Sequence, residues 1–399
     1  MPFLPEHSNL PPLSAQQQEQ AAAVMSAVRA AIAAAGGWLA FDEYLQLVMY
    51  APGLGYYSAG SAKFGANGDF VTAPELSSLF GYCVARQCAP LLGQLRAAGV
   101  GTDILELGAG SGRLAVDVLT RLATLDALPD RYLILEVSGE LRARQQALLA
   151  SEPAELRQRV AWLDSMPTQP LHAVVLANEV ADALPFKRFL VGAPGISEQG
   201  VSMGADGTLQ LRAQAAAPAL LTECQRLLRE LPAALPPGYT SECCPLLDGW
   251  IAGLAHSLAA GAILLFDYGV GRSEYYHPDR RQGTLRCHYR HRAHDDALMY
   301  PGLQDITAWV DFTRVAEAAS ACSLEVGAYC TQAAFLLGAG IDAELSAAAS
   351  DLQRARLASE ARQLLLPGEM GESFKCMALA KDIEIDARHF APHDLRRQL

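Results

Sequence analysis

The residues best placed to do chemistry begin with a set of glycines after an apolar run. In ILELGAGSGRLAVDVL, a strand-like pattern gives way to apolar residues at helical spacing, and three glycines separate the two, Gly108, Gly110 and Gly112. Glycine allows positive φ and close approach of a ligand to the backbone, while the N–H groups that open a helix favour electron-rich ligand atoms. The pattern predicts a nucleotide-like cofactor, but it also suits a purely structural strand-to-helix turn.

Two acids follow where further strands should end. Glu136 closes RYLILEV, where a carboxylate can accept hydrogen bonds from both ribose hydroxyls of an adenosine. Asp164 ends RVAWLD two residues after Trp162, an arrangement suited to an adenine amino group beside an aromatic wall. A strand-end acid by itself is more often a solvated residue, but combined with the glycine turn Glu136 favours an adenosine site.

An acid just before the glycine motif distinguishes between two classes of cofactor. The spacing is GxGxG rather than GxGxxG, and Glu106 precedes it. A negative charge there suits the sulfonium or ammonium group of S-adenosyl-L-methionine (SAM) and poorly suits the pyrophosphate of a dinucleotide. We therefore expect SAM, with no metal, and these cofactor-binding residues: Glu106, Gly108, Gly110, Gly112, Glu136 and Asp164.

Catalytic residues are predicted in ANEVADALP, after the fourth strand of the predicted sheet: Asn178, Glu179 and Asp182. The position resembles the [DN]-P-P-[YF] motif of DNA amino and glutamine methyltransferases. Here Glu179 replaces the first proline and no aromatic follows, which disfavours planar nucleobase amines. Two carboxylates instead suit a guanidinium, which they can hold through paired hydrogen bonds. The alternative is a helix start with acids near its positive end.

The elements that must position these residues alternate between strands and helices. Periodicity predicts helices over 16–36 and 40–50, an irregular segment to residue 72, a hairpin over 186–212, and helices over 216–230 and 305–321. Seven strands are expected, at 103–107, 131–137, 159–164, 172–179, 261–269, 323–331 and 373–381. This order indicates an α/β fold with a doubly wound parallel sheet, whose ligands lie beyond the carboxyl ends of its strands.

Composition narrows the function classes. The chain has 399 residues, 51% of them apolar, which is enough for a sizeable core. A net charge of −12 argues against a general nucleic-acid surface. The nine cysteines show no CxxC pair, so reduced thiols in the cytoplasm are expected rather than zinc or disulfides. No export signal, transit peptide or membrane span is expected from the sequence.

Ordered blocks along most of the chain resemble the MidA-like family of class I SAM-dependent methyltransferases, which includes a mitochondrial complex I assembly factor acting as a protein arginine methyltransferase. The blocks are YAPGLGYYS, GDFVTAPELSSLFG, ILELGAGSGRLAVDVL, EVSGELRARQ, ANEVADALPFKRF, LLFDYG, GTLRCHYRH, YPGLQDITAWVDF and MGESFKCMALA. The chain departs from the family pattern at Ala109, Arg113 and Gly139, and these changes leave the glycines of the turn intact.

The resemblance implies a Rossmann-like methyltransferase domain over 91–399, preceded by N-terminal helices and a lid segment over 1–90. Insertions are expected at about 186–260, 270–304 and 331–370. The block GDFVTAPE is read as part of the lid, with Asp69 and Thr72 near the cofactor. Equally, Thr72 could start a helix at Pro74, with Glu75 favouring its N-terminus.

The insertion over 271–296 carries six arginines and four histidines. We expect a mobile loop that faces the substrate rather than a metal site.

The sequence thus supports a SAM-dependent methyltransferase acting on an arginine nitrogen of a partner protein, which the resemblance extends to a respiratory-complex subunit. One alternative is an assembly factor that uses the fold mainly as a scaffold, since fold alone does not prove activity. Another is methylation of a small molecule. A homodimer is compatible with the sequence, and neither a nucleic-acid partner nor a membrane span is expected.

Overall fold

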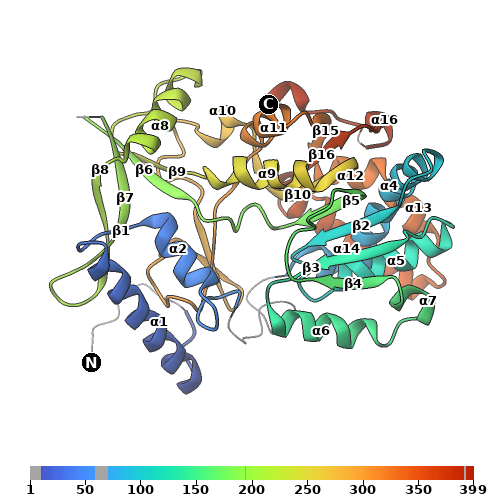
Figure 1. The fold of residues 1–399 in the computed structure, drawn as a ribbon, viewed down its shortest axis with the longest axis horizontal. Coiled ribbons are helices and arrows are strands. Elements are labelled where there is room, and N and C mark those ends of the chain that lie inside the picture. Colours follow the sequence, from blue (N-terminus) through green and yellow to red (C-terminus); the bar gives the residue numbers. More distant parts are fainter. Residues whose placement is uncertain (1–9, 59–70, 194, 391) are drawn as a thin grey trace. The chain divides into compact units, whose positions relative to one another are not determined.

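The described residues of the computed structural model, 10–58, 71–193, 195–390 and 392–399, form two compact units (Figure 1). Among them, unit 1 takes its residues from Met1–Val71, Pro185–Cys244 and Pro278–Ala308. Unit 2 takes its residues from Thr72–Leu184, Pro245–His277 and Trp309–Leu399. Each unit is therefore assembled from three separate stretches of chain.

Unit 2 is built on the seven predicted strands, which confirms the α/β fold. Their order across the sheet is β15 (Glu325–Thr331), β16 (Phe374–Lys381), β10 (Leu258–Val270), β5 (Leu171–Asn178), β2 (Asp103–Leu107), β3 (Arg131–Leu135) and β4 (Val160–Leu163). The short β14 (Val310–Asp311) adds to the end of β10. β2 and β5 are buried almost throughout, as expected for strands covered on both faces.

The sheet is mixed rather than wholly parallel, which corrects one expectation. β16 runs antiparallel to both β10 and β15, while the pairs from β10 through β4 are parallel. The reason lies in the helical excursion over 332–373. Thr331 at the end of β15 pairs with Lys375 near the start of β16, so the chain leaves and re-enters the sheet at the same edge and must run back.

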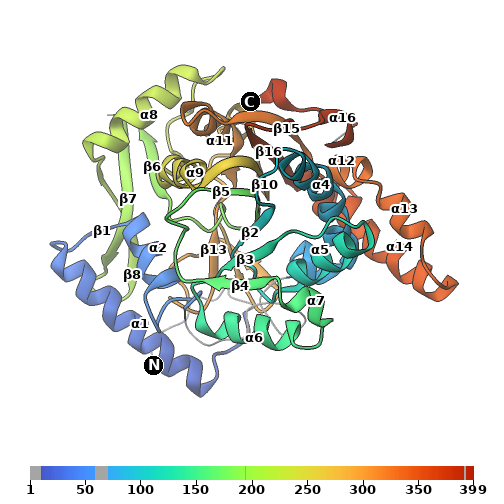
Figure 2. The same ribbon diagram turned by 45° about the vertical axis from the view of Figure 1, so that its right-hand side comes forward.

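Helices cover both faces of this sheet, and Figure 2 shows α4 and α12 on one side of it and α9 and α11 on the other. Side chains of α4, α5, α12 and α14 share one core with strand residues such as Ile104 and Leu264. The helices and the final 3-10 turn of unit 2 are α3 (Ala73–Leu76), α4 (Ser78–Ala97), α5 (Arg113–Thr124), α6 (Gly139–Leu149), α7 (Ala154–Arg157), α9 (Leu246–Ser257), α10 (Arg272–Tyr275), α11 (Phe312–Ala321), α12 (Gln332–Gly338), α13 (Ile341–Ser346), α14 (Asp351–Leu365), α15 (Met370–Ser373), α16 (Ala387–Phe390) and η1 (Arg396–Gln398).

Unit 1 has a core of its own, in which Val24, Phe41 and Tyr44 pack with residues of the inserted stretches, such as Phe186 and Ile306. Its elements are α1 (Ala15–Ala34), β1 (Leu39–Ala40), α2 (Phe41–Tyr50), β6 (Lys187–Gly192), β7 (Gly195–Met203), β8 (Leu209–Ala215), α8 (Pro218–Glu230), β9 (Tyr239–Cys243), β11 (Arg286–Tyr289), β12 (Arg292–His294) and β13 (Asp305–Thr307). Two antiparallel sheets result, β1-β7-β6-β9 with β8 on β7, and β12-β11-β13.

Three predicted elements differ from the structure. The hairpin over 186–212 is a three-stranded meander that continues to residue 215. The insertion over 271–296, for which a mobile loop was expected, contains the hairpin β11–β12. The helix predicted from residue 305 begins only at Phe312, because the Asp311 carboxylate accepts hydrogen bonds from the N–H groups of Thr313 and Arg314 and so caps α11 there.

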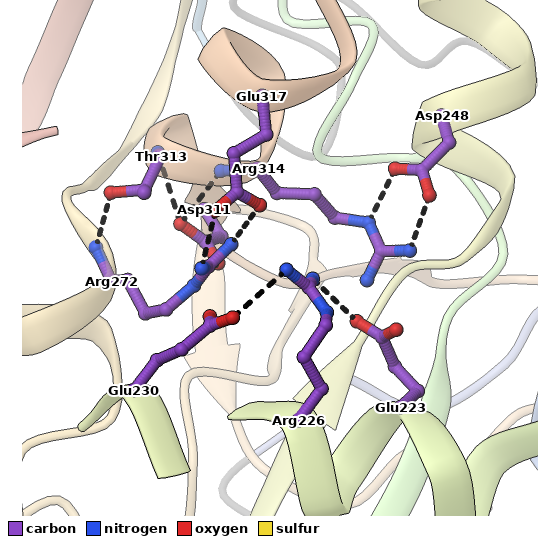
Figure 3. Close-up of polar contacts among 9 residues, drawn as sticks. All are labelled: Glu223, Arg226, Glu230, Asp248, Arg272, Asp311, Thr313, Arg314 and Glu317. Atoms are coloured by element: carbon purple, nitrogen blue, oxygen red, sulfur yellow. Dashed lines mark hydrogen bonds and ion pairs between the residues drawn. The ribbon is translucent and has the colours of Figure 1, made fainter. Parts of the chain in front are cut away.

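Arginine–carboxylate pairs fasten the elements that follow β10 (Figure 3). The Arg272 guanidinium reaches both oxygens of Glu317, at 2.7 and 2.6 Å, and lies 3.3 Å from Asp311 Oδ2. On α11, Arg314 binds both oxygens of Asp248 on α9 at 2.7 Å. Arg272 and Asp311 are buried, and a buried charge is tolerated only when it is paired. The chain just beyond β10 is therefore tied to α11.

In unit 1, Figure 3 shows a separate pairing along α8, in which Arg226 contacts Glu223 and Glu230 at 3.2 and 3.3 Å. These helix-surface pairs are partly exposed and contribute only about 0.3–0.5 kcal/mol each.

Candidate functional site

The direction of winding in unit 2 reverses at β2. From β2 the chain proceeds outward to β3 and β4, and it then returns to place β5 on the other side of β2. Ligands of open α/β sheets bind at such a reversal, beyond the carboxyl ends of the strands. Two turns lie there, the glycine turn after β2 and residues 179–184 after β5. They adjoin each other, since a Cβ on Gly108 would lie 3.5 Å from Val180 Cγ2.

The backbone of the first turn requires glycine. Gly108, Gly110 and Gly112 have φ values of 60°, 54° and 88°. Gly112 is the N-cap of α5 in the left-handed region, and a Cβ there would approach Gln145 Cγ to 3.2 Å. The α5 N-terminus therefore opens directly from a turn that has no side chains at these three positions.

Gln145 on α6 joins the parts of this site, a role that sequence reasoning missed. Its side chain is fully buried and donates to the Gly110 carbonyl at 2.9 Å and to Glu136 Oε2 at 3.1 Å. Its amide oxygen accepts a hydrogen bond from Trp162 Nε1 at 2.8 Å. Gln145 therefore fixes the glycine turn, the acid after β3 and the indole of β4 relative to one another.

Glu136 follows β3 and is 7% exposed. Its Oε1 accepts from the Ser138 N–H at 2.9 Å, so both carboxylate oxygens are oriented by the fold. The next residue, Val137, is 78% exposed, an unusual placement for a branched apolar side chain. A fixed carboxylate beside an open apolar surface fits a ribose and its base.

Glu106 lies behind the glycine turn, 3% exposed on β2, and its Oε2 accepts from the Tyr132 hydroxyl at 2.7 Å. Burial raises the pKa of Glu106 to about 7; the Tyr132 hydrogen bond lowers it and Glu136 adds to the rise. An approaching cation would favour the ionised form. This site therefore carries buried acidity suited to a positively charged ligand.

The remaining predicted cofactor residues that the structure describes, Asp164 and Thr72, have no hydrogen bond to the glycine turn among the described contacts. The Asp164 carboxylate follows β4 and pairs with Arg142 Nη1 at 2.5 Å, so it is held by α6 and is 88% exposed. Thr72 precedes α3 as its N-cap, but its side chain makes no capping hydrogen bond. Glu75 of α3 accepts a hydrogen bond from Ser111 of the glycine turn, which brings the last residue of the GDFVTAPE block to this site. Asp69 lies outside the described residues.

The second turn contains two of the predicted catalytic residues, Glu179 and Asp182, and the third, Asn178, is the last residue of β5 before it. No helix begins in this turn. Residues 179–184 form a bend and a turn, which excludes the alternative of acids at a helix start. Instead, Asp267 Oδ2 on β10 accepts from the N–H groups of Val180, Ala181 and Asp182 at 3.2, 2.9 and 3.3 Å. Burial raises the pKa of Asp267 to about 7, although the bonded N–H groups lower it. Sequence reasoning identified this strand but overlooked its acid.

Glu179 and its neighbours have constrained positions. Glu179 has a φ of 54°, uncommon for a residue with a side chain, and its N–H donates to the Phe266 carbonyl at 2.9 Å. Asn178 Nδ2 donates to Glu179 Oε1 at 3.2 Å. Asp182 is 7% exposed. The structure therefore collects Asn178, Glu179 and Asp182 at the end of β5 and in the turn that follows it, next to Gly108.

No group of three His, Cys, Asp or Glu side chains in the described part of the chain is arranged to hold a metal ion. None of the nine cysteines, all of which the structure describes, forms a disulfide. Within the described ranges, no helix is both long and apolar enough to cross a membrane.

Comparison with known proteins assigns the chain to a family. Residues 83–330 match a family model described as "putative S-adenosyl-L-methionine-dependent methyltransferase". A solved structure from Burkholderia thailandensis, of a candidate methyltransferase bound to S-adenosyl-homocysteine, is 41% identical, has a TM-score of 0.91, and the match covers 98% of this chain and 100% of that one. The mitochondrial protein arginine methyltransferase NDUFAF7 of Mus musculus is 29% identical over 86% of this chain and 81% of its own length. Its counterpart in Danio rerio is 27% identical, over 89% and 86%.

These matches confirm the resemblance inferred from the sequence blocks, and the family description confirms SAM as the cofactor. The residues present fit that group. Buried Glu106 suits a cation, Glu136 and Val137 suit an adenosine, and the α5 N-terminus opens at the glycine turn.

Replacing Glu136 by Ala should weaken SAM binding at least about tenfold, because two oriented hydrogen-bond acceptors for the ribose are lost. Isothermal titration calorimetry measures the change. Ser138→Ala is the matched control, since it removes the N-cap of α6 and leaves the carboxylate in place. An unchanged affinity in Glu136→Ala, or an equal loss in both variants, would remove Glu136 from the ribose site.

Glu106→Gln should change how stability depends on pH in the absence of SAM. The pKa of Glu106 is about 7 in the folded state and 4.5 ordinarily, so the folded state binds the carboxyl proton more tightly than the unfolded state does. The stabilisation of the fold by this protonation is full below about pH 4.5 and is lost by about pH 7. The unfolding free energy of the Gln variant should therefore rise by about 3 kcal/mol relative to the parent between pH 4.5 and pH 7.5. Urea unfolding across this range measures it; parallel stability curves for the two proteins would contradict the shifted pKa.

Proposed function

This chain belongs to the family of SAM-dependent methyltransferases matched over residues 83–330, and from that premise we propose that it methylates an arginine nitrogen of a partner protein. The single observation that carries the arginine assignment is the turn after β5. It places two carboxylates, Glu179 and Asp182, within four residues and beside the glycine turn.

Two acids match the chemistry of a guanidinium better than that of a hydroxyl or a neutral amine. A guanidinium is planar, keeps its charge and presents several N–H donors in a fixed geometry, so it can bind two carboxylates at once. Asn178 adds a buried amide oxygen, Oδ1, that has no hydrogen-bond partner among the described residues. It offers one more acceptor at the same edge of the sheet.

In this proposal Glu106, Gly108, Gly110 and Glu136 hold the cofactor, which supplies a methyl group already activated by its sulfonium. The protein's own contribution is mainly alignment: Glu179 and Asp182 orient one nitrogen of the guanidinium. The new C–N bond would form as the bond between the methyl group and the sulfonium sulfur breaks, which leaves neutral S-adenosyl-homocysteine. The nitrogen then loses a proton, which one of the two carboxylates accepts and passes to water.

We also propose a partner and a compartment: a basic segment of a protein as the substrate, and the cytoplasm. The net charge of −12 favours a basic segment of a protein as substrate. The related proteins of mouse and zebrafish carry the name protein arginine methyltransferase, which supports the arginine acceptor. Nine cysteines that form no disulfide fit a reducing compartment such as the cytoplasm.

The proposed function can be tested by adding the purified protein and methyl-labelled SAM to a lysate from cells that lack this protein. We expect label in one or a few proteins, and methylarginine in their acid hydrolysates by mass spectrometry. Label in a metabolite, or on another amino acid, would overturn the proposal. SAM binding by calorimetry with no labelled species would instead favour an assembly factor that uses the fold as a scaffold.

Asp182→Asn should lower methyl transfer by roughly a hundredfold at unchanged SAM affinity, because the amide loses a charge-assisted contact and presents a donor to a donor. Single-turnover transfer and calorimetry measure the two quantities. As a control, Asp130→Asn changes a loop acid that accepts the Thr102 N–H, at the other end of the strands. A folded, SAM-binding Asp182→Asn protein with the parental rate would exclude Asp182 from the acceptor site.

A further inference from the structure

We propose that Asp267 is a positioning residue for the methyl acceptor: it fixes the turn that carries Glu179 and Asp182 by binding three successive backbone N–H groups. This inference rests on the proposed function, because it assumes that the turn faces the acceptor. Asp267 itself is not placed in contact with substrate or cofactor.

The hydrogen bonds of this carboxylate are directed entirely at backbone. Oδ2 accepts from Val180, Ala181 and Asp182, as given above, and Oδ1 accepts from the N–H of Tyr268 at 2.9 Å. The side chain is only 2% exposed. A buried ionised carboxylate is costly unless its oxygens are satisfied, and here four N–H groups satisfy them.

Successive N–H groups converging on one point form an anion-binding concavity. In most such sites the anion is a phosphate or another ligand group, but here the protein supplies it from the neighbouring strand. The turn after β5 lacks the repeating hydrogen bonds of a helix or strand, so Asp267 replaces them. Without this acid, three backbone donors, two of them buried, would lose their shared acceptor, and nothing comparable would hold the turn in this shape.

The residue that holds the turn sits on a rigid support. β10 is paired along its length with β5 on one side and β16 on the other, and Phe266 is opposite Asn178 in register. Beyond the strand, Arg272 is fastened to Asp311 and Glu317 (Figure 3). Asp267 therefore transmits the position of the central sheet to the turn.

The two carboxylates proposed to orient the acceptor flank the three amides that Asp267 binds. Glu179 immediately precedes the first of the three, and Asp182 carries the last. Glu179 also adopts a positive φ, a strained conformation that persists only where surrounding contacts impose it. Alignment of a reacting nitrogen is sensitive to shifts of about 1 Å, which can cost roughly a hundredfold in rate.

The test compares Asp267→Asn with Asp103→Asn. Asp103 is also a buried acid of this sheet, but it lies at the start of β2, at the edge opposite to the two turns, where it pairs with Arg131. An amide offers one acceptor oxygen where the carboxylate offers two, so it cannot satisfy all four N–H groups. For Asp267→Asn we expect kcat to fall by roughly a hundredfold, with SAM affinity and the KM for the acceptor within about threefold of the parent. Asp103→Asn should keep the parental kcat.

Parental kcat in folded Asp267→Asn would overturn the proposal, as would equal losses of kcat in both variants. Amide hydrogen exchange decides the question even if the variant fails to fold. In the parent, the amides of residues 180–182 should exchange at least about a hundredfold slower than in an unfolded chain; exchange at unfolded-chain rates would overturn the proposal. Because exchange needs no acceptor, it remains informative if the labelled acceptor is not arginine, an outcome that refutes only the proposed function.

Discussion

The parallel pairing of β5 with β2 is the constraint on which this site depends. The pairing brings the ends of two strands from distant parts of the chain to the same edge, at the point where the winding reverses. β2 is followed by a turn of glycines that lets a ligand approach the backbone, and β5 is followed by a turn that carries acids. Neither turn would form a site alone, and the register Leu107 to Ala177 fixes how far apart they stand.

Buried acids dominate the electrostatics of this edge. Glu106, Glu136 and Asp267 are each less than a tenth exposed, and each is satisfied by a different kind of donor: a phenol, a backbone N–H with a glutamine amide, and a series of backbone N–H groups. Burial of so much negative charge is unfavourable in the absence of a cation. A sulfonium and a guanidinium are both cations, so the same charge distribution serves the cofactor and the proposed acceptor.

Local patterns in the sequence predicted the seven strands, because buried parallel strands are continuous apolar runs that need no knowledge of their neighbours. The glycine turn and Glu136 were accessible for the same reason, as each follows such a run. Gln145 and Asp267 were not. Their importance depends on which backbone groups they meet across 35 and 85–87 residues of chain, and no local signal distinguishes them from any other polar residue.

The direction of β16 was equally hidden, since an apolar run gives no orientation. That strand also has a consequence for biosynthesis. β16 follows both β10 and β15 in the sequence, yet it lies between them and forms hydrogen bonds with both. Until the ribosome has released residue 381, β10 has an open edge and β15 has no neighbour in the sheet. Until β16 has been synthesised, the nascent protein thus exposes an apolar strand edge, the kind of surface that chaperones cover and that other chains can pair with.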